Sequence, residues 1–233
     1  MKHYSISSEK IDLETVQFLI TSKTKIALSD SARNKISACR TYLDEKLKRH
    51  PDPIYGINTG FGSLCETKIS NDDLSKLQEN LVMSHACGTG ERVPSEIVKM
   101  MLLLKIQGLS YGHSGVQLCT VERLVDFYNH DILPVVYDQG SLGASGDLAP
   151  LAHLCLPLIG MGEVYWKGNV VPTSDMLRSF NWHAIKLQSK EGLALLNGTQ
   201  FMSAYGVWCL LQSKKLSKWS DTIAAMSLDA FNG

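Results

Sequence analysis

Apolar side chains recur at helical spacing along most of this chain, so helices dominate the structure that the sequence predicts. Leu74, Leu77 and Leu81 follow a polar start and predict a helix over 71–86. A second helix is expected to begin with Pro94 at its first position, because proline lacks the amide hydrogen that the first turn of a helix leaves unpaired.

Two more helices are predicted on either side of a glycine-rich stretch. Leu118 and Leu124 belong to an apolar stripe whose helix has to end before Pro134, because proline disfavours the helical conformation in the residue that precedes it. Asp147 precedes a second apolar run, and its side chain is expected to cap the helix that begins at Leu148.

Signals for strands are few. The segment EVYWKGNVV (163–171) predicts a hairpin that turns at Lys167-Gly168-Asn169, and another short strand pair is expected near 55–70. From Thr199 to Ala230 there is no proline and one glycine, which predicts one long helix or two in series. Thirty helical residues extend about 45 Å, so such a helix is expected to have partners alongside it.

Composition narrows the class of protein. The 233 residues carry 23 Lys+Arg and 23 Asp+Glu, and this balance predicts neither nucleic acid nor a membrane as a partner. No run approaches the ~18 apolar residues of a membrane span and no secretory signal opens the chain, so a cytoplasmic protein is expected. Six scattered cysteines without a C-x-x-C pair indicate reduced, mostly buried thiols rather than a zinc site or disulfides.

The glycine-rich stretch before Leu148 is the candidate for chemistry. Its residues 143–147 read Gly-Ala-Ser-Gly-Asp, which does not match the G-x-S-x-G pattern of a nucleophile elbow, and no strand is predicted to lead into it. The glycines at 60–62 lack the third glycine of a dinucleotide-binding loop. Taken alone, the stretch is a glycine-rich turn whose aspartate caps the next helix.

Four segments together carry more information than this loop. The segment GSLGASGDLAPLAHL (140–154) resembles the signature of the aromatic amino acid ammonia-lyases. YGINTGFG (55–62), NLVMSHACGTG (80–90) and KEGLALLNGTQ (190–200) are similar to the same family in the same order. Within the family the histidine ammonia-lyase branch is the most similar, with tyrosine ammonia-lyases or aminomutases as the alternative. The resemblance covers the whole chain but only the N-terminal half of the family's usual length.

The resemblance implies a prosthetic group made from the chain itself. The Gly146 amide nitrogen attacks the Ala144 carbonyl carbon, and two waters leave, one of them with the Ser145 hydroxyl. The product is 4-methylidene-imidazol-5-one, an electrophile formed autocatalytically, so neither an external cofactor nor a metal is expected. Glycine suits the attacking position because its backbone can approach a carbonyl closely. Asp147 either assists proton removal or caps the following helix.

The resemblance also assigns three residues to the substrate. Tyr55 is expected to remove the β-proton, which requires its hydroxyl to be more acidic than that of free tyrosine. His85 would contact the substrate imidazole, and Asn197 would hold the substrate beside the electrophile. Local chemistry alone gives simpler roles: a tyrosine packed beside a glycine turn, a cation at a helix end, and a cap or turn residue.

The implied reaction is the non-oxidative deamination of L-histidine to trans-urocanate and ammonia. In the family, the enzyme is a homotetramer, and an arginine that binds the substrate carboxylate lies in the part that corresponds to residues beyond Gly233. This chain alone is therefore expected to be inactive. The alternative to a histidine ammonia-lyase is a non-catalytic fragment or partner subunit that keeps the fold but needs another polypeptide to complete a site.

The expected fold is mainly α, with two parts. A globular region with a small β hairpin is expected over residues 1–195, and the start of a long central helical bundle over 196–233. In the second part, Leu210 and Leu216 belong to an apolar stripe that also includes Val207 and Leu211. Because one small domain cannot cover this stripe fully, the chain is expected to self-associate.

Overall fold

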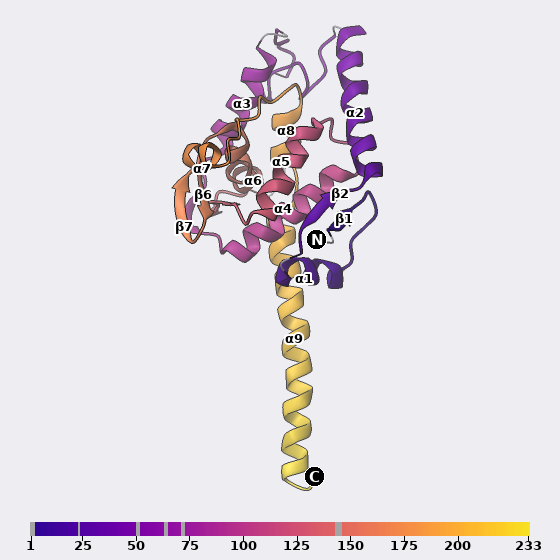
Figure 1. Cartoon of the computed structure of the whole chain (residues 1–233), viewed down its shortest axis with the longest axis vertical. Helices are drawn as coiled ribbons and strands as arrows, with labels where there is room; N and C mark the ends of the chain where they lie inside the picture. Colours follow the sequence, from indigo (N-terminus) through magenta and orange to yellow (C-terminus); the bar gives the residue numbers. More distant parts are fainter. Residues whose placement is uncertain (1–2, 23, 50–51, 63–64, 71–72, 143–145) are drawn as a thin grey trace.

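The computed structural model describes residues 3–22, 24–49, 52–62, 65–70, 73–142 and 146–233. Its elements confirm the mainly α fold, and Figure 1 shows a body of packed helices from which one long helix extends to the C-terminus. The helices are α1 (Leu13–Thr21), α2 (Asp30–Arg49), α3 (Leu74–His85), α4 (Ser95–Ser110), α5 (Leu118–Asn129), α6 (Leu148–Cys155), the 3₁₀ helix η2 (Leu156–Ile159), α7 (Thr173–Ser179), α8 (Glu191–Leu196) and α9 (Gln200–Ala230).

Within the described residues the strands form three small sheets. Strands β1 (Tyr4–Ile6) and β2 (Ile26–Leu28) pair in parallel, whereas β3 (Thr89–Arg92) and β5 (Tyr137–Gln139) pair antiparallel. Strand β6 (Glu163–Trp166) is the centre of an antiparallel sheet with β4 (Leu133–Pro134) and β7 (Asn169–Pro172).

The predicted hairpin is confirmed as β6 and β7. Its turn consists of Lys167 and Gly168, whose φ angles of 51° and 80° have the positive sign that a two-residue hairpin turn of this hand requires. Asn169 is already the first residue of β7, so the turn is one residue shorter than predicted.

The strand pair expected near 55–70 is wrong for the residues described there. A single antiparallel bridge joins Thr59 to Lys68. Gly56 and Gly62 have φ angles of 73° and 58°, so the backbone turns on both sides of Thr59 and cannot continue a ladder.

Helix α4 is the centre of the core. It packs against α1, α2, α5 and α9, so apolar residues cover nearly its whole circumference. Met101, Leu102, Leu103 and Ile106 are fully buried. The helix that positions the rest of the molecule is therefore apolar around most of its surface, and of its charged residues Lys105 is buried.

Helix ends agree with the predictions to within a few residues. Helix α5 matches its predicted span and ends before Pro134. Helix α3 begins at Leu74, with residues 71–72 outside the described part of the chain. Pro94 occupies the N-cap of α4 rather than its first helical position, because its ψ of 139° is extended.

The prediction of mostly buried cysteines is wrong. Cys155 is buried in α6 and Cys39 is partly covered, whereas the other four thiols are exposed (Cys65, Cys87, Cys119 and Cys209). Spacing alone could not show which faces of the helices these residues occupy. No helix within the described residues combines the length and the hydropathy that a membrane-spanning segment requires.

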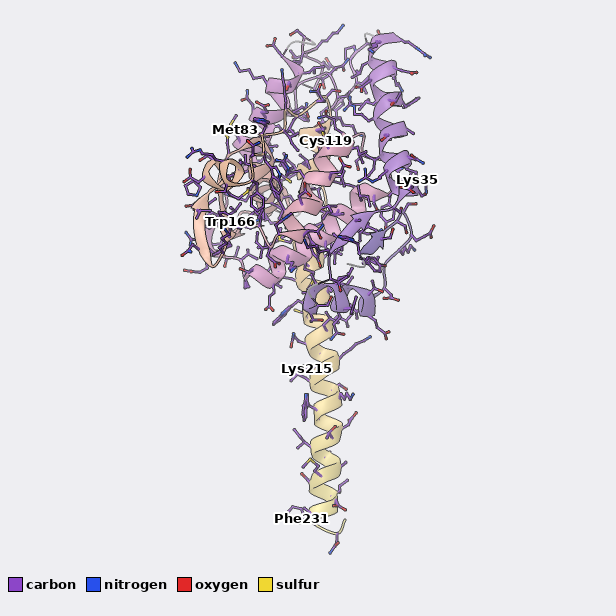
Figure 2. The ribbon with its side chains drawn as sticks, viewed as in Figure 1. Lys35, Met83, Cys119, Trp166, Lys215 and Phe231 are labelled. Carbon is purple, nitrogen blue, oxygen red and sulfur yellow. The ribbon has the colours of Figure 1, made fainter. Side chains whose placement is uncertain are left out.

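Residues 200–230 form one continuous helix, α9, as the absence of proline indicated. Its first turns pack against α4, and its single buried residue is Ala204. Beyond that contact its side chains project away from the body, as Lys215 and Phe231 do in Figure 2. Of the predicted apolar stripe, Leu210 and Leu216 are 50% and 68% exposed. The division at 195/196 stays a prediction.

Candidate active site

The described end of the candidate electrophile loop contacts the turn between α8 and α9. Gly146 has a φ of 97°, and a Cβ atom at this position would lie 2.3 Å from the carbonyl oxygen of Gly198. The Asp147 amide donates a hydrogen bond of 2.8 Å to the same oxygen. Ala144 and Ser145 lie outside the described residues. Two glycines that are 52 residues apart in sequence (198 minus 146) are thus in direct backbone contact, and only glycine fits at position 146.

Asp147 does not cap the helix that it precedes. It occupies the N-cap position of α6, but its carboxylate makes no hydrogen bond to that helix. Instead Oδ1 accepts from the Ser141 hydroxyl at 3.0 Å, and Oδ2 accepts from the Met202 amide at 2.9 Å. Met202 is in the first turn of α9, where amides have no partner within the helix and a negative charge is favourable. The side chain is buried and joins the loop to α9.

Asn197 ends α8 and leads into α9. Its amide donates to the Leu193 carbonyl at 2.9 Å, so it is the C-cap of α8 rather than an N-cap, and its side chain is exposed. Gly198 follows, and a Cβ atom there would lie 2.2 Å from Oε1 of Gln200. The turn therefore brings Asn197 beside the backbone of Gly146.

His85 is the last residue of α3 and is half-buried. Its Nδ1 lies 2.8 Å from the Leu81 carbonyl oxygen and 3.1 Å from the Ser84 hydroxyl. A carbonyl oxygen can only accept, so Nδ1 carries the hydrogen and, in the neutral ring, Nε2 is an acceptor. His85 thus donates to the Leu81 carbonyl of its own helix, and its Nε2 makes no hydrogen bond within the described residues.

Tyr55 lies on a loop that packs against α8. Its side chain is 59% exposed, and its ring meets Phe61 edge-to-face with centroids 6.0 Å apart. A Cβ atom on Gly56 would lie 2.5 Å from Cδ2 of Leu193, so the loop approaches α8 closely. The Tyr55 hydroxyl has no hydrogen-bond partner among the described residues.

Three helices that bear predicted residues at or next to their ends pack together. Helices α3, α6 and α8 pack against each other in pairs. Oε1 of Gln78 in α3 accepts from the Gly192 amide in α8 at 2.9 Å. These helices bear His85, Asp147 and Asn197 at or next to their ends.

His153 in α6 joins that helix to the segment that follows His85. Its Nε2 accepts from the Gly88 amide at 3.0 Å, and its ring meets Tyr137 edge-to-face. Burial lowers the pKa of His153, which favours the neutral ring that this hydrogen bond needs. The bond ties the segment after His85 to α6. The only sequence signal for this contact is that His153 follows Asp147 by six residues.

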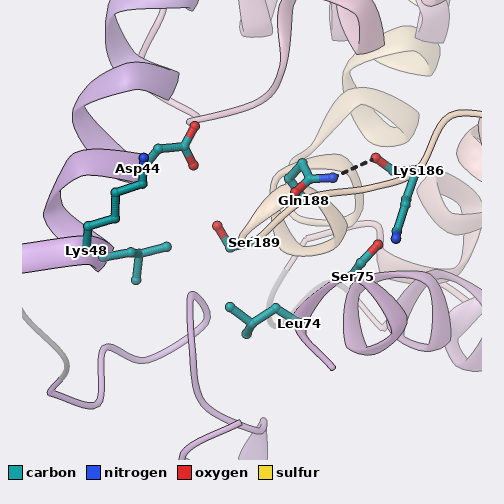
Figure 3. A pocket seen from close by; sticks show the side chains of 8 residues that line it. Asp44, Lys48, Leu74, Ser75, Lys186, Gln188 and Ser189 are labelled. Atoms are coloured by element: carbon teal, nitrogen blue, oxygen red, sulfur yellow. Dashed lines mark hydrogen bonds between the residues drawn. The ribbon is translucent and has the colours of Figure 1, made fainter. Parts of the chain in front are cut away.

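A separate cavity of about 520 Å³ opens between α2, the start of α3 and the segment before α8, and it includes none of the predicted site residues. Figure 3 shows Asp44 and Lys48 on one wall and Lys186, Gln188 and Ser189 on the other. Its lining mixes both signs of charge. No group of three or more His, Cys, Asp or Glu side chains in the described ranges is arranged to hold a metal ion.

Comparisons with known proteins match the chain to a family and to relatives of known name. Residues 11–233 match the model of a family described as aromatic amino acid lyase. A histidine ammonia-lyase of Deinococcus radiodurans is 46% identical over 224 residues, which are 95% of this chain and 43% of that protein.

Two solved structures extend the comparison. The histidine ammonia-lyase of Trypanosoma cruzi is 33% identical and superposes with a TM-score of 0.90 over 100% of this chain and 44% of its own. A tyrosine aminomutase of Streptomyces globisporus is 31% identical, with a TM-score of 0.82 over 88% of this chain and 38% of its own. The chain thus spans less than half the length of each of these proteins.

Proposed function

Since this chain belongs to the aromatic amino acid lyase family, we propose that it is the electrophile-bearing N-terminal half of a histidine ammonia-lyase. The whole protein would convert L-histidine to trans-urocanate and ammonia. One observation carries the proposal: the backbone of Gly146 lies against Gly198, so the candidate electrophile loop meets the turn that presents Asn197. Relatives that are 40–46% identical over nearly the whole chain are histidine ammonia-lyases, which supports the choice of substrate.

The proposed prosthetic group, 4-methylidene-imidazol-5-one from Ala144, Ser145 and Gly146, would supply an electrophilic carbon that no ordinary side chain offers. The described residues fit it. Gly146 has no side chain to collide with the Gly198 carbonyl, and its positive φ is accessible to glycine. Asp147 is buried and accepts two hydrogen bonds, which favours anchoring of the loop over proton removal.

Three residues would act on the substrate. Tyr55 would take the β-proton, since its hydroxyl is exposed and has no competing partner in the described chain. Nε2 of His85 would accept a hydrogen bond from the substrate imidazole, because Nδ1 is committed to the Leu81 carbonyl. The amide of Asn197 would hold the substrate beside Gly146. The Ser84-His85 pair resembles that of histidine ammonia-lyases, and some tyrosine ammonia-lyases share it.

The remaining proposals concern the whole protein. We infer a cytoplasmic homotetramer in which α9 is the beginning of a central helical bundle, with a globular region over 1–195 and the bundle from 196. The exposed apolar side chains of α9 support this arrangement, because contiguous apolar surface is normally covered by a partner.

The intact mass of the purified chain tests the electrophile. Cyclisation with loss of two waters lowers the mass by about 36 Da, and Ser145→Ala should abolish that loss. Ser217→Ala, on the exposed part of α9, is the matched control and should leave the loss unchanged. An unmodified wild-type mass would contradict ring formation in this chain.

Activity requires a completed protein. Fusing this chain to the C-terminal part of the Deinococcus radiodurans relative gives a chimera in which urocanate formation can be followed by absorbance. We expect turnover of L-histidine and its loss in the Ser145→Ala chimera. Turnover of L-tyrosine without turnover of L-histidine would overturn the proposed substrate.

A further inference from the structure

The short helix α8 is held at both ends by buried charged side chains of opposite sign. At six residues it is too short to be stable by itself, so its position depends on tertiary contacts. Glu191 begins it and is fully buried, and Lys105 of α4, 2% exposed, reaches its last turn. A negative charge at the start of a helix and a positive charge at its end each interact favourably with the helix dipole.

The contact at the end of α8 is one hydrogen bond. Nζ of Lys105 donates to the Ala194 carbonyl oxygen at 2.9 Å. Carbonyls in the last turn of a helix have no partner within it, so the ammonium supplies a donor that the helix itself lacks. Ala194 lies three residues before Asn197 and four before Gly198.

The start of α8 is fixed by the carboxylate of Glu191. Oε1 accepts from the Gln117 amide and the Thr120 hydroxyl at 2.8 and 2.7 Å. Oε2 accepts from the Gln188 amide at 2.8 Å and from Nε2 of Gln117 at 2.6 Å. These four hydrogen bonds join the helix to α5 and to its own leading segment, so α8 cannot shift along its axis at that end.

Packing alone does not account for the charge of Lys105. A buried ammonium is costly unless a carboxylate compensates it, and Lys105 forms no ion pair within the described ranges. Cys155 is near enough for its pKa to respond to the ammonium, and burial raises the pKa of that thiol to about 11, so the thiol is neutral at pH 7. An apolar residue would fill the same space without the cost of a buried charge.

We propose that Lys105 is a positioning residue: its buried ammonium holds the last turn of α8 so that Asn197 and Gly198 stay against Gly146. The Ala194 carbonyl, which Lys105 holds, lies only four residues before Gly198. The Gly198 carbonyl in turn accepts a hydrogen bond from the Asp147 amide at 2.8 Å, next to Gly146. This inference rests on the proposed function for its meaning, since Asn197 and Gly146 belong to the proposed site. The geometric part, that Lys105 holds the turn, can be tested separately.

The test compares two lysines of the same helix in the 233-residue chain. Lys105→Met removes the buried ammonium, and Lys99→Met removes a lysine of α4 that pairs with Asp131, away from α8. Amide exchange of the peptide 193–200 and the fraction of chains lacking two waters are measured for both. We expect Lys105→Met to exchange about tenfold faster or more in this peptide, because a hydrogen bond to a charged donor is lost, and to form less of the ring. Lys99→Met should match the wild type in both.

A conservative variant separates positioning from general destabilisation. Lys105→Arg keeps a buried cation with donors and should recover slow exchange at 197–198 and ring formation relative to Lys105→Met. Wild-type exchange and a wild-type ring fraction in Lys105→Met would overturn the proposal. Faster exchange spread equally over α3 and α5 would also overturn it, because it would show a general loss of stability. If no ring forms even in the wild type, the proposed electrophile fails, while the exchange of residues 193–200 still decides whether Lys105 holds the turn.

Discussion

Helices α8 and α9 follow one another in the chain and are stabilised in opposite ways. Helix α8 has six residues, four of them buried, and its ends are fixed by side chains from other elements. Helix α9 has 31 residues, one of them buried, and most of its length contacts no other part of the described structure. The proposed site residue Asn197 follows the short helix directly, so the tertiary contacts that fix α8 also fix the start of this turn.

The largest expected effect is the loss of the carboxylate at the start of α8. Glu191→Ala removes the acceptor of four hydrogen bonds in a fully buried position and leaves their donors unpaired. We expect the free energy of unfolding to fall by about 4 kcal/mol, measured by urea denaturation. Asp221→Ala, on the exposed part of α9, is the control and should change it by less than about 0.5 kcal/mol. Equal losses in the two variants would contradict the contrast between the helices.

Alanine substitutions at two glycines should change the free energy of unfolding in opposite directions. Gly146 lies against the turn that follows α8, and Gly206 lies within α9. In Gly146→Ala the new Cβ meets the Gly198 carbonyl oxygen and the φ of 97° is unfavourable, so we expect a loss of about 2 kcal/mol and no ring formation. Gly206→Ala lies within α9 with nothing near its Cβ position, so it should gain up to about 1 kcal/mol from helix propensity. Thermal unfolding and intact mass measure both. A stable Gly146→Ala chain with the ring formed would refute the close contact.

The elements that the sequence predicted are those with local signals, and the elements that it missed are fixed by contacts with other parts of the chain. Helix α9, α5 and the β6–β7 hairpin were predictable because their signals are local: absence of proline, an apolar stripe, and a glycine turn between β-branched residues. Helix α2 was missed because its inward positions include Arg40, which donates to the carbonyls of Gly115 and Ser189. Helix α8 was missed because its stability comes from its neighbours.

The candidate site was predictable in its residue types but not in its contacts. Motifs identified Gly146, Asp147 and Asn197, yet the backbone contact between Gly146 and Gly198 arises only when α6 and α8 pack together. Local chemistry assigned Asp147 to α6, whereas the folded chain directs its carboxylate to α9. Lys105 was overlooked because charged residues are normally exposed, although one cation in the apolar run MMLLLKIQGL (100–109) is a signal in hindsight.

Lys105 should also give α8 a pH dependence that α9 lacks. Burial lowers the pKa of Lys105 from 10.5 to about 8. Folding therefore disfavours the proton, the cost is complete below pH 8, and stability returns as the pH rises from 8 towards 10.5. Between pH 7 and 9 the wild type should gain about 1 kcal/mol relative to Lys105→Met, before the Cys155 thiol, whose pKa is raised, begins to oppose the gain. Lys215→Met, on exposed α9, should show no such difference from the wild type in urea titrations.

Substitutions on the outer part of α9 should have the smallest effect on the free energy of unfolding. The same substitutions should have the largest effect on self-association. Leu216 and Ile223 are 68% and 58% exposed and lie two helical turns apart on one face, so they stabilise the isolated chain little. Replacing both by serine should change the free energy of unfolding of the body by less than about 0.5 kcal/mol. The same pair should reduce self-association, because contiguous apolar surface on this helix is what a second molecule would cover. Light scattering of the wild type and the double variant at equal concentration measures this. A wild-type chain that remains monomeric would show that α9 does not drive association by itself, and equal association of both chains would place the interface elsewhere.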